Sequence, residues 1–80
     1  MNHSQRMVEA LEIQELEEAE IQFQKALIED EAADLLDLGQ YLESIGFYPQ
    51  AKEIYQQIAP TYPEVYLSLA TILAEDGQME

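Results

Sequence analysis

Apolar residues recur along this chain at spacings of three and four, and no segment shows the strict alternation of a half-buried strand. The periodicity predicts helices over residues 4–12, 15–29, 32–45, 48–59 and 64–75. The connections between them are short, so neighbouring helices are expected to run antiparallel. The pattern therefore predicts an all-α fold.

The ends of these segments carry residues that start and stop helices. Ser4 is a candidate N-cap of the first helix. Pro49 fits the first turn of the fourth helix, where its missing N–H costs nothing. Gly46 and Gly77 are expected to end the third and fifth helices in the left-handed conformation.

The sequence also repeats itself at a regular interval. A shift of 32 aligns the segments 16–27 and 48–59, each of which has an alanine, an aromatic residue four positions later and an apolar residue three after that. The same shift places Gln14 on Gly46, and a shift of 31 aligns the third predicted helix with the fifth. Each unit contains two helices, so the chain holds about two and a half units.

The order of small and large residues in these units resembles the tetratricopeptide repeat. The middle unit has the family spacing at Leu35, Leu38, Gly39, Leu42, Ala51, Tyr55 and Pro63. The third unit has it at Tyr66, Leu69, Ala70, Leu73 and Gly77. The first unit keeps only Ala19, Phe23 and Ala26, and has Arg6 and Met7 at the Leu-Gly positions. That departure is typical of a terminal capping repeat.

The resemblance implies antiparallel helix pairs stacked as an α-solenoid within a single domain over residues 1–80. We expect a degenerate capping repeat at 1–31, the best-matching repeat at 32–62, and the first helix of a truncated third repeat at 63–80. On this interpretation the chain is the N-terminal part of a longer array of bacterial type. Gly39 and Ala51 are expected where two helices cross closely.

The five tyrosines divide into two groups. Tyr55 and Tyr66 fall at signature positions and are expected in the core. The other three are expected at helix edges, where an amphipathic ring suits an interface: Tyr41, Tyr48 and Tyr62.

The chain offers little material for catalysis, and we expect no enzymatic activity, no cofactor and no metal. There is no cysteine, and the serines Ser4, Ser44 and Ser68 lack a local histidine base. His3 lies in a terminus that is expected to fray and has no acid three or four positions later. The acids Glu15, Glu17, Glu18 and Glu20 lack the glycine of a calcium loop and are expected to be solvated.

The charge balance bears on partners. Seventeen acids against three bases give a formal net charge of −14, which disfavours nucleic acids and anionic membranes and attracts basic partners. The N-terminus has no apolar signal region, and no apolar run is long enough to span a bilayer. The expected location is the cytoplasm.

The resemblance implies a protein-interaction scaffold that binds a peptide or protein on its concave helical face. It places Leu36, Gln40, Glu43 and Ser44 on that face in the second unit, and Leu67, Thr71 and Glu75 in the third. This mixed apolar and acidic lining suits apolar and basic side chains. The bases with which some family members hold a C-terminal carboxylate are missing at these positions, so that function is not supported. The alternative is a regulatory or accessory segment of a larger, possibly enzymatic, protein.

One helix is expected to lack its partner. The stripe on residues 64–75 that would meet a second helix consists of Tyr66, Leu69, Ala70 and Leu73. Two outcomes are open: self-association of two copies through this helix, or a monomer in which Tyr66 and Leu73 fold down onto the fourth helix.

Overall fold

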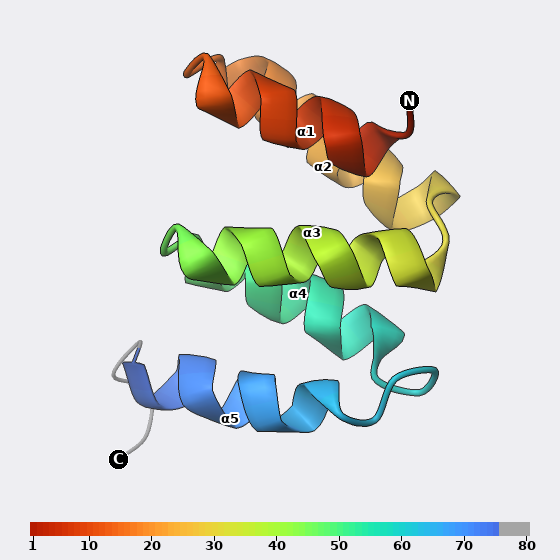
Figure 1. Cartoon of the computed structure of the whole chain (residues 1–80), viewed down its shortest axis with the longest axis vertical. Helices are drawn as coiled ribbons and strands as arrows, with labels where there is room; N and C mark the ends of the chain where they lie inside the picture. The colour runs from red at the N-terminus through yellow and green to blue at the C-terminus, as the bar shows by residue number, and fades with distance from the viewer. Residues whose placement is uncertain (76–80) are drawn as a thin grey trace. The chain divides into compact units, whose positions relative to one another are not determined.

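The structure, a computed structural model, describes residues 1–75, in which the regular elements are α-helices and no strand occurs (Figure 1). The helices are α1 (His3–Glu12), α2 (Leu16–Glu29), α3 (Ala32–Ser44), α4 (Tyr48–Ile58) and α5 (Val65–Glu75). The predicted all-α fold is confirmed, and every helix begins and ends within one residue of its predicted bounds. The predicted terminator Gly77 lies outside the described residues.

The chain divides into two compact units within α3. Unit 1 comprises residues 1–38 and unit 2 the residues from Gly39 onward. The predicted repeat boundaries, after residues 31 and 62, fall between helices instead. The repeat boundaries therefore stay predictions.

In unit 1, α1 and α2 pack against each other as an antiparallel pair (Figure 1). Their facing side chains are nearly completely buried: Met7, Ala10, Ala19, Phe23 and Ala26. Small residues at three of these positions let the two helices approach closely, while the larger side chains fill the space beside the crossing. Full burial of a side chain the size of phenylalanine or methionine contributes roughly 1.5–3 kcal/mol.

The N-cap of α1 is Asn2, and the prediction of Ser4 is wrong. The Asn2 side chain accepts a hydrogen bond from the Gln5 backbone N–H at 2.8 Å, and the Gln5 side chain accepts one from the Asn2 N–H at 3.1 Å. This reciprocal pair is a capping box. Ser4 lies inside the helix, where its hydroxyl is buried against an acid far away in the sequence.

In unit 2, α3 and α4 come into close contact at Gly39. A Cβ atom at this position would lie 2.7 Å from Cε1 of Tyr55 and 3.2 Å from Cγ2 of Ile54. Ala51, Ile54 and Tyr55 of α4 are completely buried, as predicted for Ala51 and Tyr55. Only glycine leaves room here for the tyrosine ring.

The turn after α3 is a Schellman motif centred on Gly46, which has φ +86° as predicted. The N–H of Phe47 donates to the carbonyl of Leu42 at 2.9 Å. The N–H of Gly46 donates to the carbonyl of Glu43 at 3.2 Å. These bonds satisfy carbonyls that the end of the helix leaves without intrahelical partners.

The turn after α1 has the same pattern, 32 residues earlier in the chain. The N–H of Glu15 donates to the carbonyl of Ala10 at 2.8 Å, and the N–H of Gln14 to that of Leu11 at 3.1 Å. Gln14 has φ +63°, a left-handed conformation that is uncommon for a residue with a Cβ atom. The alignment of Gln14 with Gly46 therefore corresponds to a shared backbone geometry.

The tyrosines follow the prediction except at Tyr66. Tyr55 is completely buried, and Tyr41, Tyr48 and Tyr62 are half-buried. Tyr66 is 60 % exposed, so its predicted place in the core is wrong. The side of α5 that carries Tyr66 has no covering helix in the described residues, and the face packed on α4 carries Val65, Leu69 and Ile72 instead.

Candidate functional site

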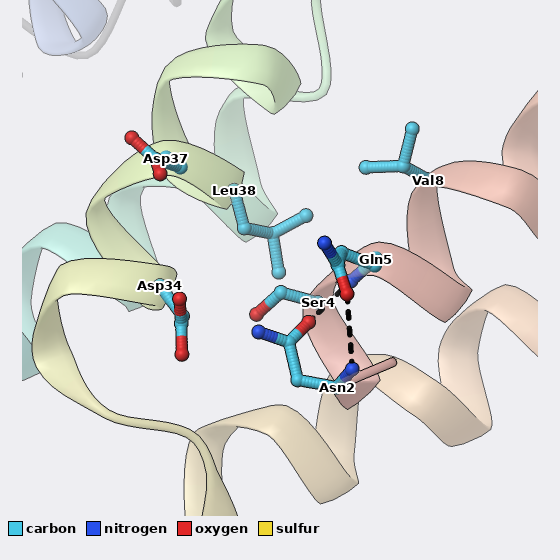
Figure 2. Close-up of a pocket in the computed structure, with 7 residues that line it drawn as sticks. All are labelled: Asn2, Ser4, Gln5, Val8, Asp34, Asp37 and Leu38. Atoms are coloured by element: carbon cyan, nitrogen blue, oxygen red, sulfur yellow. Dashed lines mark hydrogen bonds between the residues drawn. The ribbon is translucent and has the colours of Figure 1, made fainter.

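A shallow groove of about 130 Å³ opens in unit 1 beside the first turns of α1 (Figure 2). It is lined by Asn2, Ser4, Gln5 and Val8 from the α1 side and by Asp34, Asp37 and Leu38 from α3. Polar and apolar groups are therefore mixed along its walls. This mixed lining makes the groove a candidate binding site.

One wall of the groove is formed by the capping box of α1. Asn2 and Gln5 are joined by the two hydrogen bonds of the capping box, which are drawn in Figure 2. Each side-chain amide keeps at least one hydrogen-bonding atom that these bonds do not use. The wall thus presents amide groups whose orientation the capping box favours.

The opposite wall supplies negative charge. Asp34 is half-buried and Asp37 is exposed, and no hydrogen bond or ion pair from the described residues engages either carboxylate. A lysine ammonium or arginine guanidinium is the natural counterpart of such carboxylates. Val8 and Leu38 provide apolar surface along which the aliphatic stem of such a side chain can lie.

Near the groove, Asp30 from the end of α2 caps the start of α1. Its Oδ2 accepts bonds from the Ser4 N–H and the Ser4 hydroxyl, both at 2.7 Å, and Oδ1 accepts the His3 N–H at 3.4 Å. A carboxylate at a helix N-terminus satisfies backbone donors that otherwise lack partners and interacts favourably with the helix dipole. This arrangement anchors α1 and leaves the Ser4 hydroxyl engaged, so Ser4 has a structural role.

His3 is fixed as well, contrary to the expectation of a fraying terminus. Its Nδ1 lies 2.7 Å from Oε1 of Gln22, and the Gln22 amide donates to Oε2 of Glu18 at 2.7 Å. Because Oε1 of Gln22 is an acceptor, Nδ1 of His3 carries the proton. Nε2 lies 3.4 Å from Oε1 of Glu29. The ring therefore bridges α1 to the middle and to the last residue of α2.

The side chains predicted on the concave face occupy varied environments. Gln40, Ser44, Leu67 and Thr71 are exposed in unit 2, and Leu36 is half-buried in unit 1. The hydroxyl of Ser44 donates to the Tyr41 carbonyl at 2.6 Å, and that of Thr71 to the Leu67 carbonyl at 3.1 Å. The Glu75 side chain lies outside the described residues.

Glu43, the remaining residue of the predicted face, is already engaged. It accepts a hydrogen bond from the Tyr55 hydroxyl at 2.9 Å, and Ser68 of α5 also hydrogen-bonds to that tyrosine. Burial raises the pKa of the Tyr55 phenol above its usual range, and the bond to Glu43 raises it further. Glu43 therefore helps to hold α4 in place and has less freedom to meet a ligand.

Within residues 1–75, His, Asp and Glu form no group of three or more that could hold a metal ion. The acids predicted to be solvated, Glu15, Glu17, Glu18 and Glu20, are all exposed. No described helix combines the length and apolar character required to cross a membrane. Compared with protein-family models, with curated proteins and with solved structures, the chain gives no match.

Sequence reasoning did not find the groove. Asp34 and Asp37 stand in the first half of α3, where acids are common for reasons of helix stability. Nothing in the local sequence places them across from residues 2–8. The signal available was the absence of any basic residue between Lys25 and Lys52, which leaves these acids without a nearby base in the sequence.

Proposed function

We propose that this chain is a protein-interaction scaffold of the tetratricopeptide type, whose helix pairs stack as an α-solenoid. The scaffold binds a peptide that carries basic and apolar side chains. The observation that carries the binding proposal is the groove of unit 1, where two carboxylates that no described residue engages border apolar surface. A net charge of −14 supports the choice of a basic ligand.

The repeat assignment rests on geometry as well as on sequence. The turns after α1 and α3 have the same pair of hydrogen bonds, at positions that the repeat alignment places on each other. The close contact at Gly39 gives the small residue of the signature a physical reason. The exposed side chains of Gln40, Ser44, Leu67 and Thr71 supply further contact area in unit 2.

The experiment compares two labelled extended peptides by fluorescence anisotropy with the 80-residue chain: one alternates lysine and leucine, and the other has glutamate for lysine. The lysine peptide is expected to bind. Its affinity is expected to fall with added salt, because salt screens charges near a surface. Catalytic activity is not expected.

A matched pair of variants locates the binding. The double variant Asp34→Asn, Asp37→Asn is expected to bind the lysine peptide about threefold to tenfold more weakly, since exposed ion pairs are worth up to about 1 kcal/mol each. Glu17→Gln with Glu20→Gln removes the same charge from exposed positions on α2 and is expected to change affinity by less than about twofold. Equal losses in both variants, or binding of the glutamate peptide, would contradict the proposal.

A further inference from the structure

Helix α5 carries fewer charged residues than the other helices of the described range. Its one charged residue is Glu75, at its C-terminal end, whereas α1, α2, α3 and α4 each carry at least two. One side packs on α4 through Val65, Leu69 and Ile72. The other side of α5 is apolar too. Its exposure to water is energetically unfavourable.

We call this second side the open stripe of α5: Tyr66, Ala70, Leu73 and Ala74. Spacings of three and four place these residues along one line of the helix surface. Tyr66 is 60 % exposed, Ala70 and Ala74 are exposed, and Leu73 is half-buried. Of the two outcomes left open by the sequence, folding of Tyr66 onto α4 does not occur.

The chain itself shows what such a stripe normally meets. A shift of 31 places Tyr66 on Leu35, Ala70 on Gly39 and Leu73 on Leu42. Leu35 is 2 % exposed and Leu42 is completely buried. The side chain that covers Gly39 is the Tyr55 ring of α4. The equivalent cover on α5 is missing from the described residues.

Two helices of this chain act as covers, and they share one pattern. α2 packs on α1 and buries Ala19 and, four residues later, Phe23. α4 buries Ala51 and, four residues later, Tyr55, whose ring contacts Gly39. The alanine permits a close crossing and the aromatic ring fills the space beside it. A helix that fits the open stripe needs the same small residue and the same aromatic residue.

Charge decides between a second copy and a different protein. Two copies would bring together chains of net charge −14 each, and Glu64 stands directly before α5. Like charges across an interface oppose association, whereas basic residues around an apolar stripe favour it. A partner helix with an apolar stripe and a basic rim therefore complements this surface better than another copy does.

We propose that the open stripe of α5 docks an amphipathic helix of a partner protein, with an alanine and an aromatic residue four positions apart on its apolar side and basic residues around it. This surface lies on α5 in unit 2 and adds helix docking to the peptide-binding function proposed for the groove of unit 1. The recognition mode is a helix laid along an apolar surface.

The probe is a labelled peptide of residues 47–59 of this chain that carries Glu53→Lys and Gln56→Lys, both at positions exposed in α4. A second peptide adds Tyr55→Ala and keeps the same charge. Fluorescence anisotropy with the 80-residue chain is expected to show saturable binding of the first peptide. The second peptide is expected to bind at least about tenfold more weakly, because large aromatic residues dominate such contacts.

Two variants of the chain test the docking surface at equal charge. Ala70→Glu puts a carboxylate in the middle of the open stripe. It is expected to lower the affinity for the first peptide by at least about tenfold. Ala33→Glu makes the same change at an exposed alanine of α3 and is expected to weaken it by less than about twofold. Tyr66→Ala serves as a second stripe variant, and circular dichroism checks that each variant keeps its helices.

Three results would overturn the proposal. Equal binding of the two peptides would show that the aromatic residue is not seated. Equal losses from Ala70→Glu and Ala33→Glu would show attraction by net charge alone. A dimer in sedimentation that disappears in Ala70→Glu would make a second copy the occupant.

Discussion

At the residue scale, Gly39 shows how one missing side chain sets the distance between two helices. In an exposed helix, replacing glycine by alanine stabilises by roughly 0.5–1 kcal/mol because it lowers the backbone entropy of the unfolded chain. In this position the new Cβ would meet the Tyr55 ring at 2.7 Å, and ring and backbone would have to move. The two effects have opposite signs.

We therefore expect Gly39→Ala to destabilise the fold by about 1–2 kcal/mol, as overpacking usually does. Urea unfolding followed by circular dichroism measures the change. The substitution Tyr55→Leu removes the ring. In that background, Gly39→Ala is expected to destabilise the fold by less than it does in the unchanged chain. A stabilising Gly39→Ala would mean that the two helices are not in close contact here.

Tyr55 makes stability depend on alkaline pH. Its pKa is raised in the folded state by burial first and by Glu43 second, so the neutral phenol is the form that the fold favours. A raised pKa means that the contribution is complete below the unfolded value of about 10 and is lost as pH rises beyond it. The folded chain should therefore lose stability above about pH 10.

Tyr55→Phe tests this dependence. The substitution removes the hydrogen bond to Glu43 and should cost about 1 kcal/mol at neutral pH. It should also flatten the loss of stability at alkaline pH, which chemical unfolding at a series of pH values would record. As a control, Tyr66→Phe alters an exposed tyrosine and should leave the pH profile as it is. Identical alkaline profiles for Tyr55→Phe and the unchanged chain would argue against the buried phenol.

At the element scale, the turns after α1 and α3 provide a matched pair. Gln14 and Gly46 both have positive φ and end equivalent hydrogen-bond patterns, but only one of them is a glycine. A residue with a Cβ atom in this conformation costs roughly 1–2 kcal/mol. No atom outside the turn lies within 4 Å of a Cβ built at Gly46, so the strain there would be purely that of the backbone.

The reciprocal exchange is expected to act in opposite directions. Gly46→Gln should destabilise the chain by about 1 kcal/mol or more, and Gln14→Gly should stabilise it by about 0.5–1 kcal/mol. Thermal unfolding of the two variants and of the double variant measures both effects. If both changes destabilise, the two turns are not equivalent, and the alignment of Gln14 with Gly46 loses its strongest structural support.

The same elements show what the sequence could and could not predict. Helix bounds and the Gly46 turn follow from local rules of periodicity and helix termination, and they were predictable for that reason. The bond from Ser4 to Asp30 joins distant parts of the sequence and forms only once α1 lies on α2. The groove depends on such packing too. Tyr66 was misplaced because its signature position presumes a covering helix.

At the scale of the whole molecule, the imbalance of charge opposes compactness. Seventeen acids and three bases leave at most a few favourable ion pairs, whereas like charges stand close together on α2 and at the start of α3. Repulsion among them is smaller in the unfolded chain, where the acids are farther apart. Net repulsion of this kind should reduce the stability of the folded state at low ionic strength.

We expect added salt to stabilise the chain, with the melting temperature rising between low salt and about 0.5 M sodium chloride as the screening length falls to several ångströms. A variant with Glu17→Gln and Glu20→Gln carries less charge at exposed sites and should melt higher at low salt, with a smaller gain from added salt. Potassium chloride should act like sodium chloride, because screening does not depend on the identity of the ion. A melting temperature that falls with salt would show that favourable interactions, such as those of helix-terminal acids with the helix dipoles, outweigh the repulsion.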